Sequence, residues 1–228
     1  TILAKIKKMK SQNSKFLYER LCKVNSKWDM YIDKDVPRTR NNEPFFKKPE
    51  YGTAEKLTRI LKAYAAFDPE LGYTQGMNEI VGVVLMVMSN FNPSNQYQDT
   101  LQIPKSAEKN TFWILVYLMQ ELKYRDSFKD SCPKLMENIF KFESMLREEA
   151  PDMLEHMEMN GVTCHSAFTH IFLTLACQHS PVEFSVRIID VFLLKGDEVL
   201  FDVMMKVMSV CKKDIMSLQD EKLFGFFK

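Results

Sequence analysis

The sequence predicts an all-α protein, and two observations carry that prediction. Only 7 glycines and 9 prolines occur in 228 residues, whereas an all-β domain needs turn residues about every 8–12 positions. Apolar residues also recur at helical spacing in segment after segment, and no stretch alternates convincingly in the manner of a strand. Hydrophobic residues make up 46% of the chain and charged residues 27%, so there is enough apolar material for a sizeable core.

Two strong helices are predicted in the first half of the chain. Across residues 57–67 apolar side chains recur three and four positions apart. Asp68-Pro69 ends this pattern because proline disfavours helix at the residue before it. Residues 77–88 are apolar almost all round, which favours a helix buried on every side; a short buried strand is the alternative.

Two polar loops interrupt the helical pattern, at residues 41–52 and 90–105. The second is long enough to separate two lobes, so we place a boundary near residue 100. The chain then divides into an N-terminal lobe, residues 1–100, and a C-terminal helical lobe, residues 101–228.

The second half of the chain is predicted to be a further series of helices. Apolar stripes mark three of them: residues 112–122, 135–146 and 167–176. The next helix has the strongest start signal, because Ser180 as N-cap and Glu183 at N3 form a capping box around a proline. It should end at Lys195, with Gly196 free to adopt a left-handed conformation. Asp197 is expected to cap the helix that follows.

Charge and cysteine content exclude several classes of protein. Lys and Arg number 31 against 30 Asp and Glu, so the overall basic field of a nucleic-acid binder is missing. Five scattered cysteines with no C-x-x-C spacing are typical of reduced thiols, which predicts an intracellular protein. The longest apolar run, residues 80–88, is far shorter than the roughly 18 residues needed to raise a spanning helix. Any membrane contact should therefore be peripheral.

Several kinds of catalytic or ligand site are also missing from the sequence. There is no G-x-x-x-x-G-K-[ST] loop to cradle phosphates and no G-x-S-x-G elbow. Cys164, His165, His170 and Cys177 do not match a zinc spacing. We therefore expect no nucleotide, metal or other cofactor bound by the chain alone.

One polar segment, residues 32–40, places an arginine where regular structure should break. Proline precedes Arg38, which puts this arginine on a loop or at a helix end. A braced arginine on a projecting loop suits phosphate, because its planar guanidinium stays charged and forms two hydrogen bonds at once. The alternative is that Arg38 pairs with Asp35 or Asp33 only to hold the turn.

A second polar segment, residues 71–78, directly precedes the predicted buried helix. Two glycines bracket Gln75 and permit a tight backbone path. A neutral amide can both donate to and accept from a water molecule, which orients that water without deprotonating it. The alternative is that Gln75 or Thr74 merely caps the following helix.

Together these segments resemble the two signature motifs of the TBC domain, the Rab GTPase-activating family. The motifs are I-x-x-D-x-x-R, here Ile32, Asp35 and Arg38, and Y-x-Q-G-M-N, here Tyr73 and residues 75–78. Weaker similarity in the later helices extends the resemblance over about residues 16–210. Two motifs in the right order are far more specific than either alone.

The resemblance implies an all-α, two-lobed domain that binds a GTP-loaded Rab GTPase in the cytoplasm or at the cytosolic face of endomembranes. It implies an arginine finger at Arg38 and a glutamine finger at Gln75, both inserted beside a nucleotide and Mg²⁺ that the GTPase carries. The domain is then an enzyme activator rather than an enzyme. Further motif residues are expected to hold the two fingers in place: Asp35, Thr39, Tyr73 and Asn78.

The resemblance leaves partner contacts and activity open. Phe45 and Phe46, close after the arginine motif, are candidate partner contacts, with core packing of one of them as the alternative. Where the family usually continues with an aromatic residue and a proline, this chain has Arg40-Asn41-Asn42, so the loop after Arg38 departs from the family pattern. Two other readings remain: a family member that binds without accelerating hydrolysis, and a purely structural helical scaffold.

Overall fold

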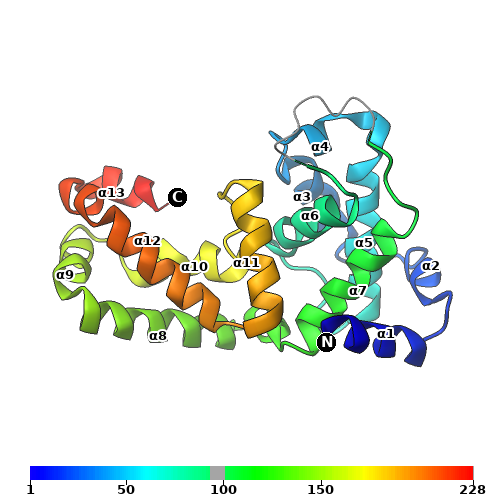
Figure 1. Ribbon diagram of the computed structural model, residues 1–228, viewed down its shortest axis with the longest axis horizontal. Helices are drawn as coiled ribbons and strands as arrows, with labels where there is room; N and C mark the ends of the chain where they lie inside the picture. Colours follow the sequence, from blue (N-terminus) through cyan, green and yellow to red (C-terminus); the bar gives the residue numbers. More distant parts are fainter. Residues whose placement is uncertain (93–100, 228) are drawn as a thin grey trace.

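Every regular element is helical in the part of the chain that the computed structural model describes, residues 1–92 and 101–227. The predicted all-α class is therefore confirmed (Figure 1). The elements, with 3₁₀ turns written η, follow in this order: α1 Ile2–Gln12, α2 Leu17–Leu21, α3 Asp29–Asp35, η1 Val36–Arg38, α4 Pro44–Lys47, η2 Pro49–Tyr51, α5 Thr53–Phe67, α6 Met77–Met88, α7 Ala107–Gln120, η3 Tyr124–Ser127, α8 Pro133–Glu149, α9 Pro151–Met159, α10 Cys164–Thr174, α11 Val182–Lys195, α12 Glu198–Ser217 and α13 Asp220–Phe226.

The first half of the chain is built around α6. This helix is buried from Met77 to Met86 because α5, α7 and α11 pack against it. The helix prediction for residues 77–88 is confirmed and the strand alternative is wrong, since a fully apolar helix is stable when neighbours cover every face. Aromatic rings fill the space between α5 and α7, with Phe112 5.8 Å from Phe67 and 5.3 Å from Trp113 between ring centroids.

The second half of the chain is a separate group of helices, with α8, α9, α12 and α13 lying away from α1–α7 (Figure 1). Its core is aromatic: Phe142 lies 4.8 Å from Phe168 and 5.6 Å from Phe172 between ring centroids. Helix α11 packs against both α12 and α6, so it joins the two halves. The predicted boundary near residue 100 adjoins residues 93–100, outside the described ranges, and the division stays a prediction.

The capping box predicted at Ser180 does not form. Pro181 is the N-cap of α11 and no side chain caps this helix, because the serine lies one residue too early. The Ser180 carbonyl instead accepts a hydrogen bond from Arg40. Asp197 does occupy the N-cap position of α12, but its carboxylate pairs with Lys134 at 2.8 Å rather than capping the helix.

The position of Gly72, against the indole of Trp28, leaves no room for a larger side chain. Its φ is +71°, and a Cβ at this position would lie 1.9 Å from Cε2 of the Trp28 indole. Replacing Gly72 with alanine is expected to lower the free energy of unfolding by about 2–4 kcal/mol, combining overpacking with a left-handed conformation. Chemical denaturation of the two proteins measures the difference.

Gly161 provides the matched control for this substitution. Its φ is +72°, but nothing lies within 4 Å of a Cβ added there. Gly161→Ala should therefore cost only the conformational part, about 1–2 kcal/mol. Equal losses at the two positions would show that contact with Trp28 contributes nothing.

Candidate functional site

The first loop of the site, which we call the arginine loop, comprises residues 36–43. Helix α3 ends at Asp35, and a single 3₁₀ turn, η1, follows from Val36 to Arg38 with Pro37 at its centre. The Arg38 side chain is 57% exposed and forms an ion pair with the buried Asp35 carboxylate. The ion pair raised from the sequence is therefore present with Asp35, whereas Asp33 pairs with Lys62 at 3.1 Å.

The second loop, which we call the glutamine loop, comprises residues 71–76 and leads into α6. Gln75 is exposed at its tip. Gly76, with φ +107°, is the N-cap of α6, and no side chain caps this helix. The alternative that Gln75 or Thr74 serves as a cap is therefore wrong, and the amide of Gln75 is left facing outward.

A buried hydrogen-bond network joins the two loops. The Tyr73 hydroxyl donates to Asp35 Oδ2 at 2.6 Å, and the Thr39 hydroxyl donates to the Asp35 carbonyl at 2.9 Å. Asn78 closes the network: its Nδ2 donates to Thr39 Oγ1 at 2.8 Å, and its Oδ1 accepts from the Gly76 N–H at 2.9 Å. Burial raises the pKa of Tyr73 far above its ordinary value, so this hydroxyl remains a donor. The supporting residues predicted from the motifs are thus in mutual contact.

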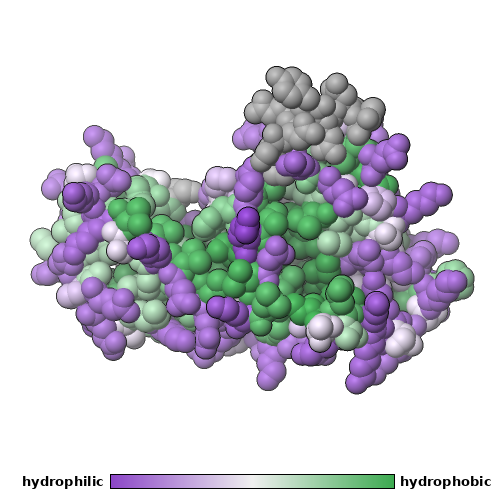
Figure 2. Space-filling model, in the orientation of Figure 1, coloured by the Kyte–Doolittle hydropathy of each residue, from purple (hydrophilic) through white to green (hydrophobic). Residues whose placement is uncertain are grey.

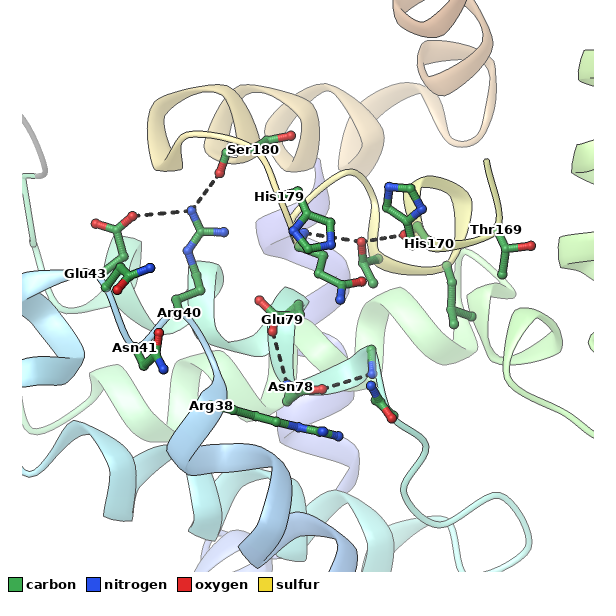
Figure 3. Close-up of a pocket in the computed structure, with 16 residues that line it drawn as sticks. Arg38, Arg40, Asn41, Glu43, Asn78, Glu79, Thr169, His170, His179 and Ser180 are labelled. Atoms are coloured by element: carbon green, nitrogen blue, oxygen red, sulfur yellow. Dashed lines mark hydrogen bonds and ion pairs between the residues drawn. The ribbon is translucent and has the colours of Figure 1, made fainter. Parts of the chain in front are cut away.

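Arg38 and Gln75 stand at the edge of a cleft of about 750 Å³. One wall comes from the arginine loop and the start of α6, and the opposite wall comes from α10 and the loop before α11, including His170 and His179 (Figure 3). In the space-filling view the molecule is hollowed on its upper side between its two halves (Figure 2). The two motifs therefore meet at a cleft whose opposite walls come from the first and second halves of the chain.

A buried carboxylate, Glu79, lines the same cleft. Burial raises the pKa of Glu79 from 4.5 to about 7, against the opposing effect of Arg40 and Arg38. Its Oε1 accepts a 3.3 Å hydrogen bond from Asn78. Its Oε2 is buried without a hydrogen-bond partner in the described part of the chain. This charge is therefore poorly compensated, and its ionisation should cost stability.

Glu79→Gln is expected to gain stability over the wild type as the pH rises. Between pH 4.5 and about 7 the unfolded chain releases the Glu79 proton and the folded chain keeps it, so wild-type stability falls over this window and the cost persists above it. A shift of this size corresponds to about 3 kcal/mol at 1.36 per unit. Denaturant unfolding at pH 4.5 and pH 8 measures the difference.

The control for this variant is Glu155→Gln on α9, where the side chain is exposed. Solvent already surrounds that carboxylate, so its replacement should shift stability by a similar small amount at both pH values. A Glu79→Gln effect that does not grow with pH would contradict the assignment of a buried, poorly compensated carboxylate.

The chain matches a known protein family over almost its whole length. The family model of the Rab-GTPase-TBC domain matches residues 2–216. The chain belongs to this family. Among relatives, this TBC domain is 32% identical over 218 residues to the ecotropic viral integration site 5 ortholog of Drosophila melanogaster, covering 96% of this chain and 25% of that protein. It is 28% identical to the Rab GTPase-activating protein eat-17 of Caenorhabditis elegans, covering 93% of this chain and 22% of that protein.

Solved structures support the same fold. The crystal structure of the Chlamydomonas flagellar RabGAP TBC domain matches with a TM-score of 0.79 and 20% identity, over 97% of this chain and 68% of that chain. The Ypt/Rab-GAP domain of Gyp1p matches with a TM-score of 0.76 and 17% identity, over 99% of this chain and 73% of that chain. The predicted all-α TBC fold is confirmed. The chain spans about a quarter of the length of the curated relatives named above.

The two phenylalanines of this TBC domain that were predicted to contact a partner differ in burial. Phe45 is 0% exposed and packs 5.0 Å from the Phe46 ring and 5.1 Å from the Phe91 ring. The expectation of partner contact is wrong for Phe45, because its side chain is held in the core by these neighbours. Phe46 is only partly buried, and for this residue the expectation stays a prediction.

Among the charged residues that line the cleft, sequence reasoning missed Arg40, Glu43 and Glu79. The only signal for Arg40 was its departure from the family pattern after Arg38-Thr39. Glu79 gave none, since a glutamate in the first turn of a helix is ordinary.

In the described residues no group of three or more His, Cys, Asp or Glu side chains is placed to hold a metal ion. Within the same ranges, no helix is long and apolar enough to cross a bilayer.

Proposed function

We propose that this TBC domain activates GTP hydrolysis by a Rab-class small GTPase in the cytoplasm, inserting Arg38 and Gln75 beside the nucleotide of its partner. One observation carries the proposal. Arg38 and Gln75 are both exposed, and the two loops that bear them are joined by one buried hydrogen-bond network. Family membership and the names of relatives such as eat-17 support the class of partner.

Arg38 suits the electrostatic half of this task. In phosphoryl transfer, negative charge spreads over the oxygens of the transferred group, and Mg²⁺ carried by the GTPase neutralises only part of it. Arg38 Nη2 is the nitrogen that bonds Asp35, and the side chain is more than half exposed. The remaining N–H donors of the guanidinium can therefore reach phosphate oxygens while Asp35 fixes its direction.

Gln75 suits the other half of the task, orienting the attacking water. Its amide offers one acceptor and two donors and does not titrate. Because Asn78 ties the backbone of Gly76 to the arginine loop, the amide is presented at a fixed place relative to Arg38. With the amide held in place, binding of the GTPase would put the attacking water in the right position relative to the phosphate. Correct positioning of reacting groups raises the rate of the chemical step.

Single-turnover GTP hydrolysis by a panel of purified Rab GTPases, with and without the domain, tests the proposal. We expect strong acceleration of one or a few members and little effect on the rest. Binding to a GTP-loaded Rab without acceleration would instead identify a non-catalytic binding module. An absence of both binding and acceleration across a broad panel would contradict the proposal altogether.

A further inference from the structure

Arg40 links the arginine loop to the C-terminal lobe. It lies two residues beyond Arg38, and its side chain is only 5% exposed. One guanidinium nitrogen, Nη1, donates to the carbonyl of Cys177, and the other, Nη2, donates to the carbonyl of Ser180 at 2.9 Å. Glu43 lies 3.7 Å from Nη2 at the rim. Figure 3 shows Arg40 reaching toward Ser180 while Arg38 extends below Asn78.

The glutamine loop rests against the same part of the C-terminal lobe. A Cβ added to Gly76 would lie 3.4 Å from Leu173 Cγ and Thr174 Cγ2, so the backbone beside Gln75 packs directly on the end of α10. Residues 173–180 thus contact both loops. We call this segment the α10 turn.

The α10 turn is well suited to act as a fixed reference for both loops. Leu175 and Ala176 both adopt left-handed backbone conformations, with φ of 52° and 56°. Hydrogen bonds hold this shape: the Ala176 N–H donates to the Ile171 carbonyl at 2.8 Å and the Cys177 N–H donates to the Thr174 carbonyl at 2.9 Å. The two carbonyls that Arg40 binds are therefore presented by an ordered turn, and a planar two-pronged donor matches them.

We propose that Arg40 is a positioning residue that anchors the arginine loop to the α10 turn and thereby fixes Arg38 at its working distance from Gln75. This inference rests on the proposed function. It also accounts for the departure at residues 40–42: here a buried arginine attaches the loop after the finger to the second lobe. Asp35 sets the direction of the Arg38 side chain, whereas Arg40 sets the path of the backbone that carries it.

The charges around Arg40 favour a single position for its guanidinium. Glu79 faces it from α6, with Arg38 and Asp35 also close enough to influence the Glu79 carboxyl. Arg40 Nε and Glu79 Oε2 are each buried without a hydrogen-bond partner in the described ranges. A cation that holds two carbonyls beside an undercompensated carboxylate is not easily replaced, because lysine offers one point charge instead of a fork.

The first experiment uses the Rab GTPase that the panel identifies. It measures the maximal rate of stimulated GTP hydrolysis, and the domain concentration that gives half of it, for wild type, Arg40→Ala and Arg40→Lys. We expect Arg40→Ala to lower the maximal rate by about 10- to 100-fold, since a misplacement of about 1 Å can cost about 100-fold. The half-saturating concentration should change by less than about three-fold, because the Arg40 side chain is only 5% exposed and offers little surface to a partner. Arg40→Lys should fall between wild type and Arg40→Ala. Arg147→Ala on α8, which removes an arginine and its ion pair with Glu143 outside the cleft lining, is the control and should stay within about two-fold of wild type.

A double-mutant cycle distinguishes positioning from direct action. If Arg40 acts through Arg38, adding Arg40→Ala to the Arg38→Ala variant should change the rate by less than about two-fold. If instead the double variant shows the product of the two single losses in maximal rate, the proposal is overturned. A rise in the half-saturating concentration with an unchanged maximal rate would also overturn it, since that would make Arg40 a partner contact.

Amide hydrogen exchange tests the anchoring without any GTPase. In Arg40→Ala, exchange should accelerate at residues 38–43 and 175–180 and stay unchanged at Asn78, whose network Arg40 does not join. Unchanged exchange in both segments would overturn the anchoring. Faster exchange in a domain that accelerates no Rab would instead show that the anchor exists and that the proposed function has failed.

Discussion

Arg38→Ala is expected to reduce the maximal rate of stimulated hydrolysis by at least about 10³-fold, the lower end of the 10³–10⁵ range for arginine fingers. The guanidinium acts mainly when charge develops on the phosphoryl oxygens, so its loss should appear in the rate and not in binding. Single-turnover measurements at saturating domain give the rate, and titration of the domain gives the half-saturating concentration, which should change by only a few-fold.

The control for this variant is Arg147→Ala on α8. Arg147 is 60% exposed and pairs with Glu143, much as Arg38 is 57% exposed and pairs with Asp35. Loss of a comparable surface ion pair far from the cleft should leave hydrolysis unchanged. Stimulation by Arg38→Ala that matches wild type would remove the finger assignment entirely.

Gln75→Ala is expected to reduce the maximal rate by about 10²–10³-fold, as removal of one transition-state hydrogen-bonding group does in other enzymes. The water would remain beside the nucleotide, but nothing from the domain would orient it. Because Gln75 caps no helix, the substitution should leave the thermal midpoint nearly unchanged. Circular dichroism melting alongside single-turnover hydrolysis separates these effects.

Gln120→Ala, at the exposed end of α7, is the control for loss of a glutamine amide. It should leave both rate and melting unaltered. If Gln75→Ala stimulates hydrolysis normally, the GTPase orients the water itself and the two-finger mechanism is excluded.

Much of the helical fold could be predicted from the sequence because its signals are local. Residues 57–67 and 77–88 carry their periodicity and stop signals within one segment, and the structure ends α5 and α6 at Phe67 and Met88. The first helices gave no comparable signal, because α1 carries four lysines among its eleven residues and α2 to α4 are only one to two turns long. Short helices depend on packing against other elements for their stability.

The candidate site shows the same division between local and distant information. Arg38 and Gln75 could be proposed because each lies in a motif readable within a few residues. The roles of Arg40 and Gly72 could not, since Arg40 binds carbonyls 137 and 140 residues away and Gly72 is required by an indole from another segment. Ser180 failed as a cap for a local reason, because the helix begins one residue later than its position requires.

The hydrogen-bond network between the two loops also limits how this site can be transplanted. Tyr73 and Asp35 are 38 residues apart in sequence, and Asn78 and Thr39 are 39 apart. A peptide or grafted loop that carried either finger alone would lack half of the groups that shape it. Engineering the site into another helical scaffold would therefore require α3, the start of α6 and the turn after α10 to be moved together as one unit.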